Sequence, residues 1–215
     1  MWPTICVDNF FNDPDKVFKF ANSLKYTPDN EGRWPGERSD ELHKIDRNFF
    51  EFFGKKTLSI LYPMQKEISF SLHLTFQKIS KKYINEGWVH EDNGYINEFT
   101  SIVYLSKHKE CGTSLFDSKK IHSFPINVIQ KHDTYLKDNF KEGDIYLKEN
   151  NNQFEETISI KSKYNRFIMF DSSQLHAAQK FTENTIEEDR LTLVGFFENV
   201  YFPNIKLNGV QHKRI

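Results

Sequence analysis

Apolar and mostly polar side chains alternate along the stretch Ile68-Ser69-Phe70-Ser71-Leu72-His73-Leu74-Thr75-Phe76. Successive strand residues point to opposite faces of a sheet, so this period of two predicts a half-buried strand. His73 is out of phase with Leu72 and Leu74, which predicts that it faces solvent or a second layer. Further strand candidates follow at 99–105, 114–116, 157–160, 167–170, 176–181 and 191–197. Many short strands after helices predict a mainly β protein, a double-sheet barrel with helical support.

Residues 1–66 are expected to be mostly helical support for this barrel. Asn12-Asp13-Pro14-Asp15 is typical of a helix start, with a capping side chain and Pro in the first turn. A second helix is predicted at about 41–56, and a polar loop with a Pro-Gly turn at 26–40. A short helix is expected at 124–140, inside an insertion at 118–153. Without any linker, the chain is expected to be a single domain, 1–215, with its core at 67–200.

Composition narrows the class of protein. The formal net charge is -1 and the two signs are well mixed, which does not favour a nucleic-acid or membrane-surface partner. Cys6 and Cys111 are the only cysteines, so a disulfide framework is not expected and a reducing compartment is the default. No signal peptide is visible, and no apolar stretch is long enough to cross a bilayer. We expect a cytoplasmic protein; heavy use of Lys, Asn, Ile and Phe is typical of AT-rich genomes, including viral ones that act in a host cytoplasm.

Four polar residues occur in an order that indicates metal chemistry. His90 and Asp92 lie in Trp88-Val89-His90-Glu91-Asp92, and His176 and Arg190 follow later in the chain. In a strand, residues two apart face the same side, so His90 and Asp92 can bind one metal. Two histidines and one carboxylate are the ligand set of non-haem Fe(II) sites that leave positions open for a cosubstrate and dioxygen. Arg190 suits an anionic cosubstrate because a guanidinium binds a carboxylate through two parallel hydrogen bonds.

Each of these residues also has a simpler reading. A His-x-Asp pair occurs by chance in a chain with many acids, and His176 alone is compatible with a partly buried histidine satisfied by the backbone. Arg190 and Thr192 alternate with Leu191 and Leu193, which places both polar side chains on one side of a strand. The alternative for Arg190 is a position at the rim, where it would pair with the acidic run Glu187-Glu188-Asp189.

Taken together, these residues resemble the 2-oxoglutarate- and Fe(II)-dependent dioxygenases, in particular the prolyl-4-hydroxylase-like branch and its small phage and bacterial members. The resemblance covers about residues 67–200 and implies a double-stranded β-helix core of the jelly-roll, cupin-like type with N-terminal helices. It implies that the metal ligands are His90, Asp92 and His176. It also implies that the distal carboxylate of 2-oxoglutarate is bound by Arg190, Thr192 and Tyr104, the last in the strand Phe99-Thr100-Ser101-Ile102-Val103-Tyr104-Leu105. Cys111-Gly112-Thr113-Ser114-Leu115-Phe116 resembles the family's Gly-Gly-Thr/Glu-Leu strand, with Cys in place of the first Gly.

The resemblance implies Fe(II), 2-oxoglutarate and O2 as reactants, with ascorbate as an auxiliary reductant. The implied reaction hydroxylates a peptidyl (prolyl-type) or small-molecule substrate and releases succinate and CO2. Trp34 and Arg38 are candidates for a substrate loop, and the alternative is a structural turn with Trp34 packed on the barrel. Two rival functions remain, a zinc-type metalloenzyme and a non-catalytic ligand-binding barrel. A zinc enzyme gives Arg190 and Thr192 no role.

Overall fold

Two antiparallel sheets form the body of the protein. The computed structural model describes residues 2–65, 67–83, 85–92, 98–120 and 125–201. The larger sheet has the spatial order β1-β8-β5-β10-β4-β3-β2. Its strands are β1 (Ile5–Val7), β2 (Tyr26–Pro28), β3 (Glu37–Ser39), β4 (Ser69–Ile79), β5 (Phe99–Tyr104), β8 (Arg166–Asp171) and β10 (Arg190–Tyr201). The smaller sheet has the order β7-β6-β9, with β6 (Thr113–Ser118), β7 (Phe154–Ile160) and β9 (His176–Ala178). This arrangement confirms the predicted mainly β, jelly-roll type of fold.

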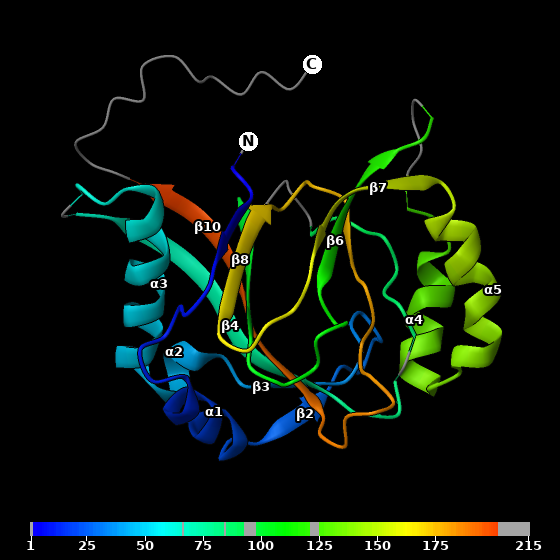
Figure 1. Cartoon of the computed structure of the whole chain (residues 1–215), viewed down its shortest axis with the longest axis horizontal. Coiled ribbons are helices and arrows are strands. Elements are labelled where there is room, and N and C mark those ends of the chain that lie inside the picture. The colour runs from blue at the N-terminus through cyan, green and yellow to red at the C-terminus, as the bar shows by residue number, and fades with distance from the viewer. Residues whose placement is uncertain (1, 66, 84, 93–97, 121–124, 202–215) are drawn as a thin grey trace.

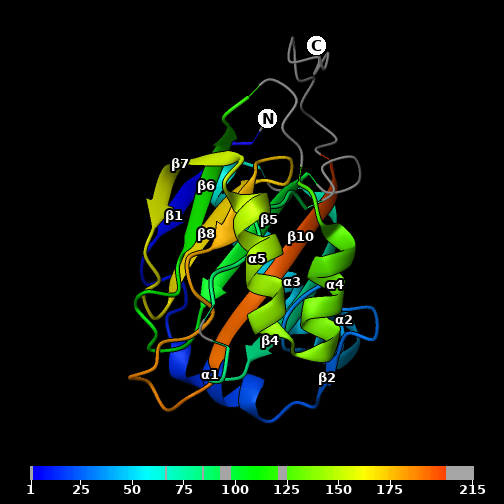
Figure 2. The same cartoon turned by 90° about the vertical axis from the view of Figure 1, so that its right-hand side faces the viewer.

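Helices cover the two sides of the molecule. The helices α1 (Pro14–Asn22), α2 (Leu42–Ile45) and α3 (Arg47–Leu61) lie against the larger sheet, on the left in Figure 1. The helices α4 (Val128–Lys137) and α5 (Phe140–Asn151) lie side by side at the opposite end, on the right of Figure 1 and toward the viewer in Figure 2. None of the helices among the described residues is long and apolar enough to span a bilayer.

The helix start predicted at residues 12–15 is confirmed. Asp13 is the N-cap of α1, and its carboxylate accepts a hydrogen bond from the backbone N–H of Lys16 at 3.0 Å. The single helix expected at 41–56 is instead two helices, α2 and α3. Asp46 separates them because its backbone is extended, at φ -145° and ψ 93°, and its side chain caps α3 by accepting from the N–H of Phe49.

The polar loop predicted at 26–40 is wrong in part, because this segment contains β2 and β3. Glu37 and Arg38 of β3 pair with Lys78 and Gln77 of β4. These two strands end the larger sheet, where polar side chains are tolerated and the apolar alternation that marks a buried strand is absent. The helix expected at 124–140 begins at Val128, and residues 121–124 lie outside the described residues. A second insertion helix, α5, was not predicted.

Alternation along the central strands sorts their side chains onto two faces. One face packs on α1–α3 in the main core, together with Phe53 of α3. It is supplied by Leu74 and Phe76 of β4, Phe99 and Val103 of β5, Phe167 and Met169 of β8, and Leu191, Leu193 and Phe197 of β10. The rings of Phe99 and Phe197 stack on adjacent strands with centroids 4.3 Å apart. The opposite face carries Thr100, Arg190 and Thr192, which line an internal cavity. The helix-backed face therefore stabilises the fold, and the other face is free to carry chemistry.

Candidate metal centre

The side chains of His90, Asp92 and His176 converge at one point. Each offers one ligand atom, and these atoms all lie within 4.8 Å of one another. Asp92 Oδ1 lies 3.6 Å from His90 Nε2, and Asp92 Oδ2 lies 3.2 Å from His176 Nε2. Ligands that share adjacent positions on one metal, at bond lengths near 2.1 Å, are about 3 Å apart. The arrangement needs little adjustment to hold a metal ion.

Pairing of the backbone brings the two histidines together. His90 and His176 form an isolated antiparallel bridge, which extends the smaller sheet beyond β9. The His90 N–H donates to the His176 carbonyl at 3.0 Å, and the His176 N–H donates to the His90 carbonyl at 2.9 Å. Their rings lie on the same side, with centroids 4.5 Å apart. Two histidines separated by 85 intervening residues thus become neighbours through two hydrogen bonds.

Each histidine is also oriented by a carbonyl two residues before it. Nδ1 of His90 lies 2.7 Å from the carbonyl oxygen of Trp88, and Nδ1 of His176 lies 2.9 Å from that of Gln174. A carbonyl only accepts, so both Nδ1 atoms carry the proton and donate it. In its neutral form each ring therefore carries its lone pair on Nε2, and both Nε2 atoms face Asp92. Fixing the tautomer in this way is typical of metal-binding histidines.

Asp92 is held by a hydroxyl that sequence reasoning missed. Thr100 of β5 donates its hydroxyl proton to Asp92 Oδ2 at 2.7 Å, and Thr100 Oγ1 lies 3.1 Å from the hydroxyl of Ser172. The backbone N–H of Asp92 donates to the Ser172 carbonyl at 2.9 Å. The sequence did contain a signal for Thr100. It is four residues before Tyr104 in one strand, so the two side chains lie on the same face of the sheet.

The charges of the three groups depend on one another. Burial opposes ionisation of Asp92, but attraction by His176 and its hydrogen bond outweigh burial and lower the pKa of the carboxyl group. Burial likewise opposes the charged form of His176, but Asp92 outweighs it and raises the pKa of that imidazole. For His90, burial lowers the pKa, and the positive charges of Lys131 and His176 lower it further. The group therefore contains a carboxylate and a neutral His90, two of the forms that bind metal.

A cavity of about 120 Å³ adjoins the three side chains, and Arg190 and Thr192 line its wall. Arg190 is only 5% exposed. Its buried Nε has no hydrogen-bond partner among the residues that the structure describes, and burial lowers the pKa of the guanidinium. The centroid of the Tyr104 ring lies 5.9 Å from Arg190 Cζ, and the thiol of Cys111 is close enough to interact with the charge of Arg190. A buried cation without an anion is costly, so the site is prepared for an anionic ligand.

The alternative of a rim position for Arg190 is wrong. The acidic residues before it have other partners in the structure. Glu187 pairs with Lys81, Glu188 accepts from the backbone N–H of Lys107, and Asp189 accepts from that of Lys81.

Tyr104 lies beside Arg190 at the end of β5. Its hydroxyl is hydrogen-bonded to Thr113 Oγ1 at 2.8 Å, and burial raises the pKa of the phenol to about 12. Thr113 itself lines the cavity. Tyr104 and Arg190 are thus neighbours, as the resemblance implies, and a role for Tyr104 in binding a carboxylate stays a prediction.

Trp34, just before β3, and Arg38, within β3, also line the cavity. The Arg38 guanidinium stacks on the Trp34 ring at 4.1 Å. Gly36 fixes the turn between them, because its φ is +72° and a Cβ there would lie 2.2 Å from the Lys78 carbonyl oxygen. Gln77 donates to the Pro35 carbonyl at 2.9 Å and so holds the same turn on β4. The predicted loop therefore lies at the candidate site, and a role in binding substrate stays a prediction.

Sequence reasoning also missed Lys131. This residue belongs to α4, in the segment predicted to be an insertion, and its side chain lines the cavity. Burial lowers the pKa of its amine to about 8, and the charge of Asp92 partly opposes that shift. Lysine on a helix is usually solvated, so the sequence offered no signal for this position.

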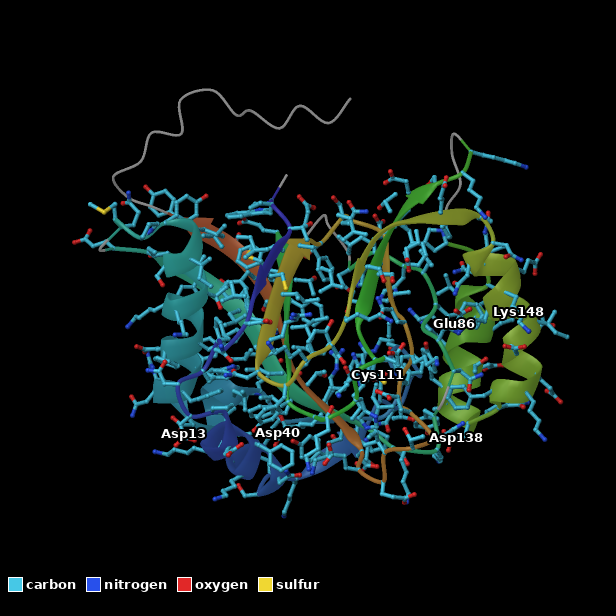
Figure 3. All side chains as sticks on the ribbon, viewed as in Figure 1. Asp13, Asp40, Glu86, Cys111, Asp138 and Lys148 are labelled. Atoms are coloured by element: carbon cyan, nitrogen blue, oxygen red, sulfur yellow. The ribbon has the colours of Figure 1, made fainter. Side chains whose placement is uncertain are left out.

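A second group of metal-ligand types, His108, Cys111 and Glu183, lies elsewhere in the described residues. Both ring nitrogens of His108 are already engaged, Nε2–H by the Glu188 carbonyl at 2.8 Å and Nδ1 by the Glu183 N–H at 3.2 Å. Burial raises the pKa of the Cys111 thiol to about 11, so it is not a thiolate at neutral pH. Cys111 lies just before β6, in the middle of the molecule (Figure 3). This group is structural.

The fold is shared with several enzymes of known structure. HygX from Streptomyces hygroscopicus, crystallised with nickel and 2-oxoglutarate, gives a TM-score of 0.55 at 10% identity, over 91% of this chain and 82% of that chain. SnoN, a non-haem α-ketoglutarate-dependent epimerase from nogalamycin biosynthesis, gives 0.57 at 10% identity, over 99% and 86%. A Pseudomonas putida prolyl-4-hydroxylase gives 0.50 at 11% identity, over 91% and 92%. At these identities the similarity shows the fold.

The sequence also matches a protein family. Residues 2–197 match the "Family of unknown function (DUF6445)", and the chain belongs to this family. A search of curated proteins gives no match.

Proposed function

We propose that this protein is a 2-oxoglutarate- and Fe(II)-dependent oxygenase that hydroxylates a peptidyl (prolyl-type) or small-molecule substrate. The observation that carries the proposal is the buried Arg190, whose Nε has no acceptor within the described part of the chain and which lines the same cavity as two histidines and one carboxylate. A metal site beside an unmatched buried cation fits a ligand that chelates the metal at one end and carries a carboxylate at the other. Enzymes with this fold that are described as binding 2-oxoglutarate support the same reading.

The donor set fits Fe(II). His90, Asp92 and His176 would hold the ion through two neutral Nε2 atoms and a carboxylate oxygen, which leaves open positions on the metal. Bound together, Fe(II) and 2-oxoglutarate supply the oxidising chemistry, in which O2 oxidises a substrate C–H bond as 2-oxoglutarate becomes succinate and CO2. Trp88 and Gln174 fix the histidine tautomers through their carbonyls, and Thr100 fixes the Asp92 carboxylate.

Arg190 and Thr192, both buried in the cavity wall, would bind the distal carboxylate of 2-oxoglutarate. The binding would give Arg190 an acceptor that none of the described residues provides, through charge-assisted hydrogen bonds. The apolar side chains of Ile102, Val194 and Phe181 line the same cavity. A zinc enzyme would use the three metal ligands and leave Arg190 without a partner. A barrel that only binds ligands would have no need for the oriented histidines.

Turnover of 2-oxoglutarate tests this function. The protein is incubated with Fe(II), ascorbate, O2 and 2-oxoglutarate, and succinate is measured. We expect slow succinate formation even without the substrate, and its loss in His176→Ala. His73→Ala is a matched control. The side chain of His73 is 59% exposed on β4, and it has no part in the proposed metal site. Equal succinate yields from the wild-type protein and His176→Ala would refute the proposal.

A further inference from the structure

Three unmatched hydrogen-bond donors surround a single cavity. Trp34 Nε1, Arg38 Nε and Arg190 Nε are buried, and no described residue forms a hydrogen bond with any of them. All three residues line the cavity next to His90 and Asp92. The distal carboxylate of 2-oxoglutarate would satisfy Arg190. Trp34, which precedes β3, and Arg38, which belongs to β3, would still lack an acceptor among the described residues.

Arg38 is held in place by aromatic stacking, and only longer-range attraction to Asp92, Asp29 and Glu41 acts on its charge. Its guanidinium lies 4.1 Å from the centroid of the Trp34 ring and 5.7 Å from that of Phe196. The neighbouring Arg33 differs, because it forms an ion pair with Asp29 at 2.7 Å. No ion pair of Arg38 is found within the described residues. Stacking of this kind positions a guanidinium and leaves its N–H groups available.

Lys131 brings a second cation from a different element. It is half-buried on α4 and lines the same cavity. In the part of the chain that the structure describes, its ammonium forms no ion pair or hydrogen bond. The exposed Lys137 of the same helix, by comparison, pairs with Asp133 at 2.9 Å. Lysine side chains rarely turn inward unless they are paired with an anion. This position therefore indicates that Lys131 binds an anionic ligand.

The balance of charge in the cavity indicates which kind of ligand group would bind there. Asp92 is the only carboxylate among the described residues that line the cavity. With Fe(II) and 2-oxoglutarate bound, the positive charges of the metal and Arg190 would be balanced by Asp92 and the 2-oxoglutarate dianion. Lys131 and Arg38 would then remain as two positive charges that no further carboxylate among the described cavity-lining residues balances.

We propose that the substrate of this site carries a carboxylate or phosphate group, and that Lys131 and Arg38 bind that group. This inference rests on the proposed function and adds the chemical class of its substrate. It assigns the insertion helix α4 a part in substrate selection, because α4 supplies one of the two cations. The anion would also accept from the Trp34 indole N–H, which is the remaining unmatched donor.

Anion binding to the cosubstrate-loaded protein tests this inference. Inorganic phosphate and acetate are titrated separately, by calorimetry, into anaerobic protein saturated with Fe(II) and 2-oxoglutarate. The two probes distinguish a phosphate-bearing from a carboxylate-bearing substrate. We expect Lys131→Met to weaken binding of the preferred probe at least tenfold, and Lys131→Arg to retain it. Affinity for 2-oxoglutarate should change less than twofold in both variants. Lys137→Met is the matched control and should leave both affinities unchanged.

Two results would overturn the inference. Equal anion affinities in the wild-type protein, Lys131→Met and Arg38→Met would mean that no anion site exists at these residues. A loss of 2-oxoglutarate affinity in Lys131→Met would assign Lys131 to the cosubstrate. If the wild-type protein binds no 2-oxoglutarate, the proposed function fails, and the same titrations of the metal-free protein still show whether Lys131 binds an anion. The two failures are therefore distinguishable.

Discussion

Replacing Arg190 with Met is expected to change two properties in opposite directions. Arg190 is buried and lines the candidate site, and none of the described residues accepts a hydrogen bond from its Nε. Met has a similar length and no charge. The substitution should therefore weaken the binding of 2-oxoglutarate and, at the same time, stabilise the protein when neither metal nor 2-oxoglutarate is bound.

The size of both effects follows from burial. Removing one partner of a buried, hydrogen-bonded charge pair costs about 2–5 kcal/mol, so the affinity for 2-oxoglutarate should fall by a factor of about 30 to several thousand. Replacing buried ionic groups by apolar ones stabilises proteins by up to about 4 kcal/mol. Weak attraction of Arg190 to the Tyr104 ring opposes this gain, so we expect about 1–3 kcal/mol. For a domain of this size, each kcal/mol raises Tm by about 2–4 °C.

Thermal unfolding of the metal-free protein and an anaerobic titration with 2-oxoglutarate measure the two effects. Arg166→Met is the matched control, because Arg166 begins β8 and pairs with Asp8 at 2.6 Å near the surface. It should leave the 2-oxoglutarate affinity unchanged and should not raise Tm. A destabilised Arg190→Met variant that binds 2-oxoglutarate normally would refute the reasoning and make Arg190 a structural residue.

Three further predictions concern the metal ligands and the group formed by His108, Cys111 and Glu183. Thr100→Val removes the hydrogen bond to Asp92 and should lower Fe(II) affinity about 10- to 100-fold in a chelator competition assay, whereas an unchanged affinity would deny Thr100 its positioning role. Fe(II) affinity should fall as pH drops below the raised pKa of His176, by up to tenfold per pH unit, because the metal replaces the proton on Nε2; a flat profile between pH 6 and 8 would contradict this. His108→Ala should cost about 1–3 kcal/mol of unfolding free energy in urea and leave bound iron at the wild-type level, and loss of iron would show that His108 is not merely structural.

The central part of the fold could be predicted because its pattern is strong. Along β4, each apolar residue from Leu72 to Phe76 packs on the helices, and His73 is exposed as its phase required. The strands β1 and β3 are only three residues long and lie at or near the edges of the sheet, so they carry no readable alternation. Helix α5 buries only Gly143, Leu147 and Asn150, and this face is too narrow and too polar to stand out in the sequence.

The site was predictable to the extent that strand phase determines it. His90 and Asp92 are two residues apart, and so are Arg190 and Thr192. In an extended strand the two side chains of each pair must lie on the same face. The meeting of His90 with His176 depends on pairing between distant segments and could be inferred only from the family resemblance. Lys131 could not be found, because its position depends on how the insertion packs against the barrel.

An anaerobic titration of 2-oxoglutarate into the Fe(II)-loaded protein tests the central proposal most directly. A metal-to-ligand charge-transfer band in the visible spectrum reports chelation of the metal by the cosubstrate, and His176→Ala is titrated alongside. We expect a saturable band in the wild-type protein and none in the variant. Iron bound by the wild-type protein without such a band would contradict the assignment of iron, cosubstrate and site together.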